Sequence, residues 1–488
     1  MLDTAATTFL LVMLVFVAIG ALSMRRKANS VDDYLTASSQ VPPWLVGLSA
    51  VATNNSGYMF IGLIGFTFVE GVSAAWLAFG WLVGDLLAWY TIHPAVRRFS
   101  ENHPVNTVPA LIAHRGERSG GPLRALTGLL IVVFLAVYAA AQLMAGGKVL
   151  NVVFGWPAWL GVIGGAGVVL VYSFAGGLRA SIWTDAAQSF VMLFGMVALL
   201  AAGLLDIGSP VTLWRALGGI DPALTTLVPD GLVLGFPLFL LGWIAAGLGV
   251  AGQPHLIVRT LALRSPDGIR AARRVYFAWY LPFVIMTVLV GLYARALFDG
   301  APDMLDPELA LPLMARTYLP DIGVGIVLAA VVAAAMSTAD SMLLSTSAAV
   351  SQDMFHRFGQ SYVRTKLGTA LVTVAVVLIA VGAPANVFEL VILAWSGLGA
   401  TLGPALTVRV LGWPLGYPTA FAMVVAGLAG VLGWRALGLG DAVYEILPGF
   451  ACAAAAYGCG RLVELAAGRP RPDAAAGAAA ITPGASHG

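Results

Sequence analysis

The chain has 488 residues, of which 59% are apolar and only 10% are Asp, Glu, Lys or Arg. A soluble domain carries roughly 25% charged residues, so this composition excludes a water-soluble protein of this length and indicates that lipid surrounds most of the surface. The net charge of +2 is too small to indicate a nucleic-acid partner.

Long apolar segments follow one another along almost the whole chain, and a helix needs about 20 such residues to cross a bilayer. They predict an all-α polytopic membrane protein with about thirteen transmembrane helices. The expected spans lie near residues 7–24, 44–69, 72–93, 122–151, 157–175, 181–206, 232–256, 275–298, 322–351, 366–383, 386–411, 417–436 and 443–466.

Basic residues gather in alternate loops between these spans. They occur at 25–27, after the first span, and at 270–274, before the eighth, whereas the acidic stretch 303–308 lies in a loop of the opposite side. Because basic loops stay on the cytoplasmic side, we expect the N-terminus outside and the C-terminus inside the plasma (inner) membrane. Residues 468–488 are rich in Ala, Pro and Gly and are expected to form a disordered tail.

The second expected span is polar at its centre. It contains Thr53, Asn54, Asn55, Ser56 and Gly57, and hydrocarbon offers such side chains no hydrogen-bond partner. We therefore expect the helix to break here and to free backbone carbonyls and side-chain oxygens for binding a cation. The alternative is a polar contact between helices that binds no ligand.

The seventh expected span is also interrupted. It contains Gly247, Gly249, Gly252 and Pro254, which lower helix stability and remove one hydrogen-bond donor. This break comes five spans after the first one, and an odd separation reverses the orientation of the second unit in the membrane. Two inverted repeats of five helices, each opening with a broken helix, are typical of secondary transporters.

The ninth expected span carries small and polar residues on one face. Ala334, Ser337 and Ser341 repeat at helical spacing, and carbonyl and hydroxyl oxygens are ligands that hard cations prefer. Asp340 lies on the adjoining face, where a buried acid favours an ion-linked role. Asp185, in the sixth expected span, is a candidate partner carboxylate or, alternatively, a helix cap at the membrane interface.

Several short segments, taken in this order, resemble the sodium:solute symporter family. They are 176–179 with 183–185, 252–255 with Arg259, 335–338, and 394–399 followed by 403–404. The resemblance extends over residues 30–460 and implies a leucine-transporter-type fold, in which ten core helices form a 5+5 inverted repeat. The first repeat would lie in residues 44–206 and the second in 207–411, with an extra helix in 1–43 and two more helices in 412–467.

The resemblance also implies a sodium site between the first broken helix and the ninth span. Its ligands would be Ala52, Asn55, Ala334, Ser337 and Thr338. Some members of the family share a second cation site. The positions that match it here are Asp185, Ser337, Asp340 and Ser341. The compared members have Ser at the position of Asp340, so the charge in this chain favours a stronger second site or coupling to protons.

The implied solute site differs from that of the family member that transports proline. That member has Asp at the position of Asn54, and its solute-contacting Trp and Tyr correspond to Ala246 and Val250. Two rings replaced by small groups change the shape of the pocket, so we do not expect proline as the solute. The candidate solute-binding residues are Asn54, Ser56, Gly57, Tyr138, Gln142, Val250, Gln253 and Trp395.

These patterns predict a secondary active transporter and not an enzyme. Na⁺, the coupling ion, would drive symport of a small polar organic solute, an amino acid or an organic acid, by alternating access. A solute sensor or an uncoupled channel with the same fold is the alternative. The expected partners are membrane lipid and the solute, with no obligatory protein partner. Asp85, a further acid in the third span, has no assigned role.

Overall fold

The computed structural model describes residues 3–23, 28–103, 105–114, 121–229, 231–298, 306–355, 359–382 and 386–467. Within these residues the chain is helical, apart from connecting segments and an isolated β-bridge between Val41 and Leu263. The expected disordered tail at 468–488 and the basic residues at 25–27 lie outside the described residues.

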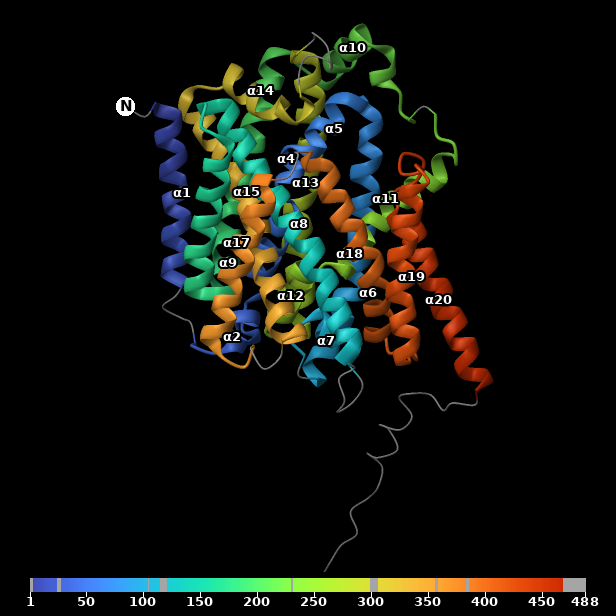
Figure 1. The fold of residues 1–488 in the computed structure, drawn as a ribbon. Helices are drawn as coiled ribbons and strands as arrows, with labels where there is room; N and C mark the ends of the chain where they lie inside the picture. Colours follow the sequence, from blue (N-terminus) through green and yellow to red (C-terminus); the bar gives the residue numbers. More distant parts are fainter. Residues whose placement is uncertain are drawn as a thin grey trace, which may run out of the picture.

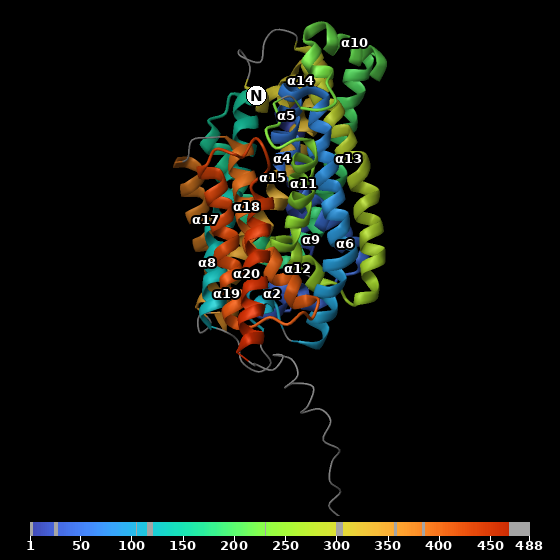
Figure 2. The ribbon, with the colours of Figure 1, turned by 90° about the vertical axis from the view of Figure 1, so that its right-hand side faces the viewer.

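Long helices form the body of a bundle, and short helices lie across its ends (Figure 1). The helices of the body are α1 (Thr4–Ser23), α3 (Pro43–Asn54), α6 (Ala75–Asn102), α8 (Gly121–Phe154), α9 (Ala158–Asp206), α11 (Phe236–Leu248), α13 (Ile269–Leu297), α15 (Asp321–Ala348), α17 (Tyr362–Gly382), α18 (Val387–Val410), α19 (Tyr417–Ala436) and α20 (Ile446–Ala466). At one end, called the α10 end, lie α10 (Pro210–Ile220) and α14 (Ala310–Tyr318); at the other, called the α2 end, lie α2 (Val31–Thr36) and α7 (Val108–Ala113) (Figures 1 and 2).

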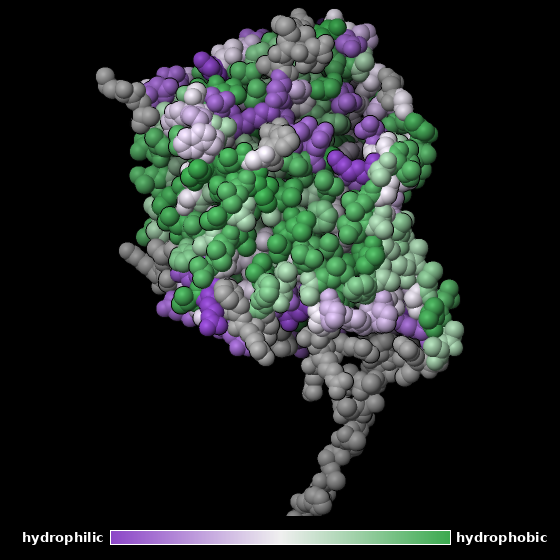
Figure 3. Space-filling view, viewed as in Figure 1, coloured by the Kyte–Doolittle hydropathy of each residue, from purple (hydrophilic) through white to green (hydrophobic). Residues whose placement is uncertain are grey.

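The outer surface is apolar over the middle of the bundle and more polar at both ends (Figure 3). Large apolar side chains such as Leu14, Phe190 and Val374 are exposed on it. Lipid tails solvate such a surface, and helices satisfy their own backbone hydrogen bonds within lipid. The chain is therefore an all-helical polytopic membrane protein.

The described part of the chain contains ten helices that are long and apolar enough to cross a membrane, or eleven if a bent pair counts as one span. This measure counts fewer spans than the thirteen expected segments, because it joins or leaves out helices that are interrupted. Residues 57–102 are counted as one span, although they contain part of the second expected span and all of the third. The helix α3, which begins the second expected span, has only 12 residues and is too short to be counted. The fifth is the shorter apolar helix Ala158–Phe174, and the seventh is the bent pair.

The first break lies where the polar segment predicts it. The helix α3 ends at Asn54, Asn55 leaves the helical conformation with ψ at 70°, and α4 (Gly57–Phe60) and α5 (Gly62–Glu70) continue the path. Ser56 caps α4, because its hydroxyl accepts a hydrogen bond from the Tyr58 N–H at 3.1 Å. The break leaves carbonyls of the last turn of α3 without helical partners.

The second break also follows the sequence. The helix α11 passes through a tight turn at Gly249–Gly252 into α12 (Pro254–Ala262), which is bent from it by 56°. Glycine permits close packing here, since a Cβ atom on Gly84 of α6 or on Gly247 of α11 would overlap the backbone of the other helix. The two helices therefore meet backbone to backbone beside the break.

A third interruption divides α9. Gly177 has a φ of 58° and lies against Tyr34 of α2, so the chain turns at the α2 end and produces two arms. In the expected 5+5 arrangement of core helices, one set would be α3–α5, α6, α8 and the two arms of α9. The other set would be α11–α12, α13, α15, α17 and α18.

Candidate functional site

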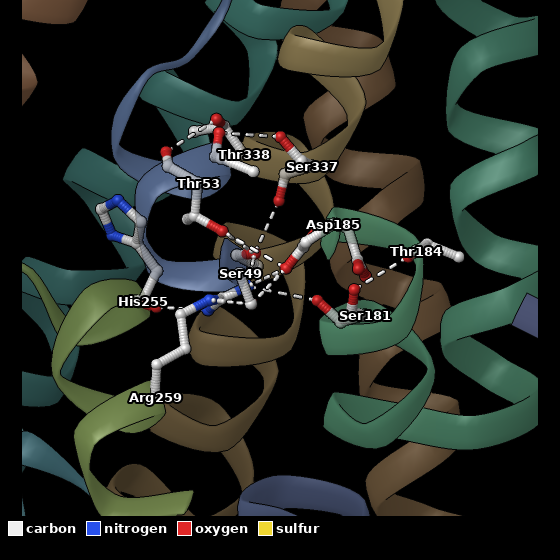
Figure 4. Close-up of polar contacts among 12 residues, drawn as sticks. Ser49, Thr53, Ser181, Thr184, Asp185, His255, Arg259, Ser337 and Thr338 are labelled. Carbon is white, nitrogen blue, oxygen red and sulfur yellow. Dashed lines mark hydrogen bonds and ion pairs between the residues drawn. The ribbon is translucent and has the colours of Figure 1, made fainter. Parts of the chain in front are cut away.

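Two hydroxyls of α15 face the last turn of α3, where the first break begins (Figure 4). The Ser337 hydroxyl donates to the Ala52 carbonyl oxygen at 3.1 Å, and the Thr338 hydroxyl donates to the Thr53 carbonyl oxygen at 2.9 Å. Both hydroxyls also lie within hydrogen-bond distance of the Ala334 carbonyl oxygen, at 3.0 and 3.1 Å. Three carbonyl oxygens and two hydroxyls thus converge between the two helices; we call them the oxygen cluster.

The oxygen cluster fits a monovalent hard cation. Hard cations prefer carbonyl and hydroxyl oxygens, and these five ligands carry no formal charge that would favour a divalent ion. All five residues are buried, so the protein oxygens would replace the water around a bound ion. The hydroxyls can rotate from donating to a carbonyl to presenting a lone pair to the ion.

Most of the residues expected at the sodium site belong to this cluster. These are Ala52, Ala334, Ser337 and Thr338. Asn55 is adjacent along the chain, but its backbone N–H and its side-chain amide both donate to the Val51 carbonyl oxygen. Thr53 was not expected as a ligand, although its place beside Asn54 in the polar segment was a signal.

A fully buried ion pair lies next to the oxygen cluster (Figure 4). Nη2 of Arg259 on α12 lies 2.8 Å from Oδ2 of Asp185 on α9, and neither side chain is exposed. Arg259 also donates to the hydroxyls of Ser49, at 2.9 Å, and of Ser341. Ser49 in turn donates to Asp185 at 2.6 Å. The pair therefore links α3, α9, α12 and α15, and it is compensated by further hydrogen bonds, as a buried ion pair requires.

The residues expected at a second cation site are arranged around this ion pair. Asp185 and Ser341 both bind Arg259, so a guanidinium lies where the sequence placed a second cation. Asp340 accepts a hydrogen bond from Ser173 on α9, and its Oδ2 has no partner among the described residues. Sequence analysis named Arg259 within a family-like segment but gave it no role, although a charged residue just after an interrupted apolar span was a signal.

Asn54 reaches the buried acid of α6. Its Nδ2 lies 3.4 Å from Oδ2 of Asp85 and also donates to the Tyr276 hydroxyl, which donates to the same Asp85 oxygen at 2.6 Å. Asp85 is fully buried. Within the described part of the chain, neither Oδ1 of Asp85 nor Oδ1 of Asn54 has a hydrogen-bond partner. Two buried acceptors without donors are unusual, and a ligand with N–H groups would satisfy them.

A small cavity borders Asn54 at the level of the break. It measures about 10 Å³ and is lined by aromatic side chains that include Tyr58, Trp81, Tyr138 and Tyr280. A volume of this size holds about one water molecule, so an organic solute requires the helices to move apart. Asn54 and Tyr138 were expected at the solute site. The other aromatic residues have no spacing that distinguishes them from packing residues in a sequence.

Three further expected solute residues hold the first break in place. The Gly57 N–H donates to Oε1 of Gln142 on α8 at 2.9 Å, and Ser56 caps the short helix that follows the break. Nε2 of Gln142 is buried and has no partner in the described structure. These residues position the backbone around the small cavity.

The remaining expected solute residues lie at the second break. Gln253 donates through Nε2 to the Trp395 carbonyl oxygen at 3.0 Å, and Trp395 donates through Nε1 to the Ala246 carbonyl oxygen at 2.8 Å. Val250 is buried in the turn. The Trp395 ring lies 4.8 Å from the Trp81 ring, centroid to centroid, and so connects this break to the small cavity.

A larger cavity of about 600 Å³ lies toward the α10 end. Its lining includes the acidic residues Glu70 and Glu389 and the aromatic residue Phe388. The Phe388 ring stacks on Tyr58, which lines the small cavity, with 5.4 Å between ring centroids. The stacked rings of Phe388 and Tyr58 thus connect the lining of this larger cavity, which we call the vestibule, to the lining of the small cavity.

Comparison with known proteins gives a consistent result. The sequence profile of the sodium:solute symporter family matches residues 34–414. The chain is 29% identical to the osmoregulated proline transporter OpuE of Bacillus subtilis, over 87% of this chain and 88% of that protein. It is 30% identical to the sodium/proline symporter of Escherichia coli, over 91% and 90%. A solved Na⁺-coupled sialic acid symporter, in a substrate-bound outward-open state, shares the fold with a TM-score of 0.79 over 93% of this chain and 96% of that one, at 16% identity.

Proposed function

We propose that this chain, which belongs to the sodium:solute symporter family, uses a sodium gradient to drive uptake of a small polar organic solute. The observation that carries the proposal is the meeting of the Ser337 and Thr338 hydroxyls with the freed carbonyls of Ala52 and Thr53. A Na⁺ ion bound there would tie α15 to the first broken helix. That helix also carries Asn54, which borders the small cavity.

Coupling would arise because Na⁺ binds between α15 and the first broken helix with different affinity in different conformations. If the outward-open conformation holds the oxygen cluster together and the inward-open one separates it, Na⁺ stabilises the first and favours solute binding to it. The coupling free energy is reciprocal, so solute must strengthen Na⁺ binding by the same factor. Alternating access follows from rocking one group of helices about a site near the middle of the membrane.

The solute class that we propose is an amino acid. The relatives that the chain resembles include proline transporters, and the free Oδ1 atoms of Asn54 and Asp85 suit the N–H donors of an ammonium group. The substitutions noted at Ala246 and Val250 favour a solute shape other than that of proline. Proline remains the reference compound for a comparison of amino acids.

We propose that one Na⁺ accompanies each solute molecule. The candidate second site would need Asp185 and Ser341, and both already bind Arg259. A second cation beside the guanidinium would meet a like charge in a region of low dielectric constant. Arg259 is therefore proposed to act as a permanent, tethered cation at that position.

The proposed orientation places the α10 end outside the cell. Arg97 and Arg179 lie at the α2 end, where they donate to the backbone carbonyls of Arg264 and Ala37, and basic residues favour the cytoplasmic side. Acidic residues, among them Glu70 and Glu389, line the vestibule of the opposite end. A negative vestibule would raise the local concentration of Na⁺ at the entrance.

Uptake into proteoliposomes tests the proposal. Purified protein is reconstituted, a gradient of Na⁺ is imposed with equal K⁺ as the control, and accumulation of labelled amino acids is followed, with proline as the reference. Concentrative uptake that requires the Na⁺ gradient is expected. Uptake that only equilibrates would identify an uncoupled channel, and solute binding without any flux would identify a sensor.

A further inference from the structure

A third cavity borders α8 and α15, and the proposed transport mechanism does not use it. It measures about 230 Å³ and lies among α1, α8, α9 and α15. Its lining is apolar except for Gln142, and it includes Phe9, Met13, Trp156 and Met336. An apolar cavity of roughly 150 Å³ stays free of water and takes up a hydrocarbon such as benzene, so this larger one suits a hydrocarbon ligand.

Glycine residues keep this cavity open. Gly146 of α8 and Gly164 of α9 both line it. A Cβ atom on Gly146 would meet only a Val332 methyl group, at 3.9 Å, and one on Gly164 would meet no atom within 4 Å. Side chains at these two positions would therefore occupy the cavity without displacing the backbone.

The surroundings of the cavity identify its occupant as a lipid chain. Leu10 of α1 and Leu160 of α9 line it and are 40% and 43% exposed on the apolar flank of the bundle. Their outer neighbours Leu14 and Ile163 are also exposed, so the mouth of the cavity opens to the bilayer. Lipid tails are the molecules present there, and a dry cavity left empty would forfeit its dispersion contacts.

The depth of the cavity matches one segment of an acyl chain. Along α8 it extends from Leu150 to Gln142, which at the helical rise is about 12 Å. Trp156, near the α10 end of the cavity, is of the residue type that favours the membrane interface. A lipid of that leaflet would place its head group near Trp156 and its chain toward Gln142.

The inner wall of the cavity belongs to the machinery of the candidate site. Gln142 holds the Gly57 N–H at the first break, and its unpartnered Nε2 belongs to a residue that lines the cavity. Ala335 and Met336 line it as well and directly precede Ser337 of the oxygen cluster. A ligand in the cavity would therefore press on both the broken helix and α15.

We propose that this cavity binds an acyl chain of a membrane lipid, inserted between α1 and α9 with its end against Gln142 and Met336. The bound chain supports α15 and α8 from behind, at the level where the oxygen cluster and the first break meet. Binding of the lipid stands independently of the proposed transport activity, whereas its effect on Na⁺ binding rests on the proposed function.

Photolabelling tests the lipid site directly. Full-length protein is placed in nanodiscs that contain phosphatidylcholine with a diazirine at the middle of one acyl chain, and labelled peptides are identified by mass spectrometry. Label is expected on the lining segments of α8 and α9, including residues 146–150 and 161–168. The variants Gly146→Leu and Gly164→Leu should each lose most of this label, because a leucine side chain fills the cavity.

Gly167→Leu is the matched control. Gly167 is an exposed glycine of α9, like Gly164, and has open space around it, but it does not line the cavity. It should keep the wild-type label. Label that is as strong on exposed residues of α20 as in the cavity, or that survives both leucine variants, would mean that lipid only coats the surface and would overturn the proposal. Size-exclusion profiles verify that each variant is folded, and two separate leucine variants keep the test decisive if one fails to fold. Transport does not enter this readout, so its result is independent of the proposed function.

Discussion

The guanidinium of Arg259 lies 2.8 Å from the carboxylate of Asp185, and both side chains are completely buried at the junction of four helices. Arg259 comes from the helix after the second break, and its partner Ser49 comes from the helix before the first. The guanidinium of Arg259 thus connects the two interrupted helices beside the oxygen cluster.

Removal of one member of this pair should destabilise the protein strongly. Arg259→Gln leaves the Asp185 carboxylate buried without its counter-charge, which costs about 3–5 kcal/mol. The double variant Arg259→Gln/Asp185→Asn removes both charges and should recover part of the loss. Thermal unfolding of detergent-purified protein measures the effect. Equal stability of the single variant and the wild type would show that the pair does not hold the helices together.

Asp85 should determine solute affinity without affecting Na⁺ binding in the absence of solute. A hydrogen bond to a charged group contributes about 1.5–3 kcal/mol, so Asp85→Asn should weaken binding of an amino-acid solute by roughly 10- to 150-fold. Tyr276→Phe, which removes only the hydroxyl that donates to Asp85, should have a smaller effect. Binding assays with the best solute from the uptake experiment measure both.

Asp321→Asn is the control for the Asp85 variant, because Asp321 is an exposed acid at the start of α15. It should bind solute like the wild type. If Asp85→Asn also bound solute normally, the buried carboxylate would have no part in recognition, and the ammonium group would be bound elsewhere.

The close contact of α6 and α11 should not tolerate even one methyl group. Gly84→Ala places a Cβ atom into the backbone of α11, and either the helices separate or the second break is distorted. Gly433→Ala on α19 is the matched control, since its Cβ meets no atom within 4 Å and alanine favours a helix by about 1 kcal/mol over glycine. The yield of monodisperse protein after solubilisation should fall sharply for the first variant only; normal yield of Gly84→Ala would contradict the observed packing.

Much of the fold was predictable because polar side chains that face lipid are energetically unfavourable. A continuous helix that faces lipid would not favour the amides of Asn54 and Asn55 or the glycines from Gly247 to Gly252. Both breaks could therefore be placed from the sequence. Hydropathy reports apolar length and not helix continuity, so the thirteen expected segments outnumber the ten or eleven helices that count as continuous spans. The turn at Gly177 lies between the expected spans 157–175 and 181–206, so the division of α9 was also predictable, although the positive φ of Gly177 was not.

The candidate site was predictable in part for a similar reason. Ser337 and Thr338 lie in a span whose polarity is visible, and their facing carbonyls follow from the break in α3. The partners of Asp185 and Asp85 were not visible, because Arg259 and Tyr276 are distant in sequence and are brought near only by packing. The ion pair bears on the predicted second cation site, since two of its four expected ligands, Asp185 and Ser341, contact the guanidinium of Arg259.

Equilibrium binding of ²²Na⁺ to the purified protein tests the central claim most directly. We predict one Na⁺ per molecule in the wild type, and a loss of affinity of about tenfold or more in Ser337→Ala and in Thr338→Val, because each removes an oxygen that contacts the ion. Thr346→Val, which removes a buried hydroxyl of the same helix that has no partner among the described residues, should bind Na⁺ like the wild type. Wild-type affinity in both site variants would contradict a sodium site between α3 and α15.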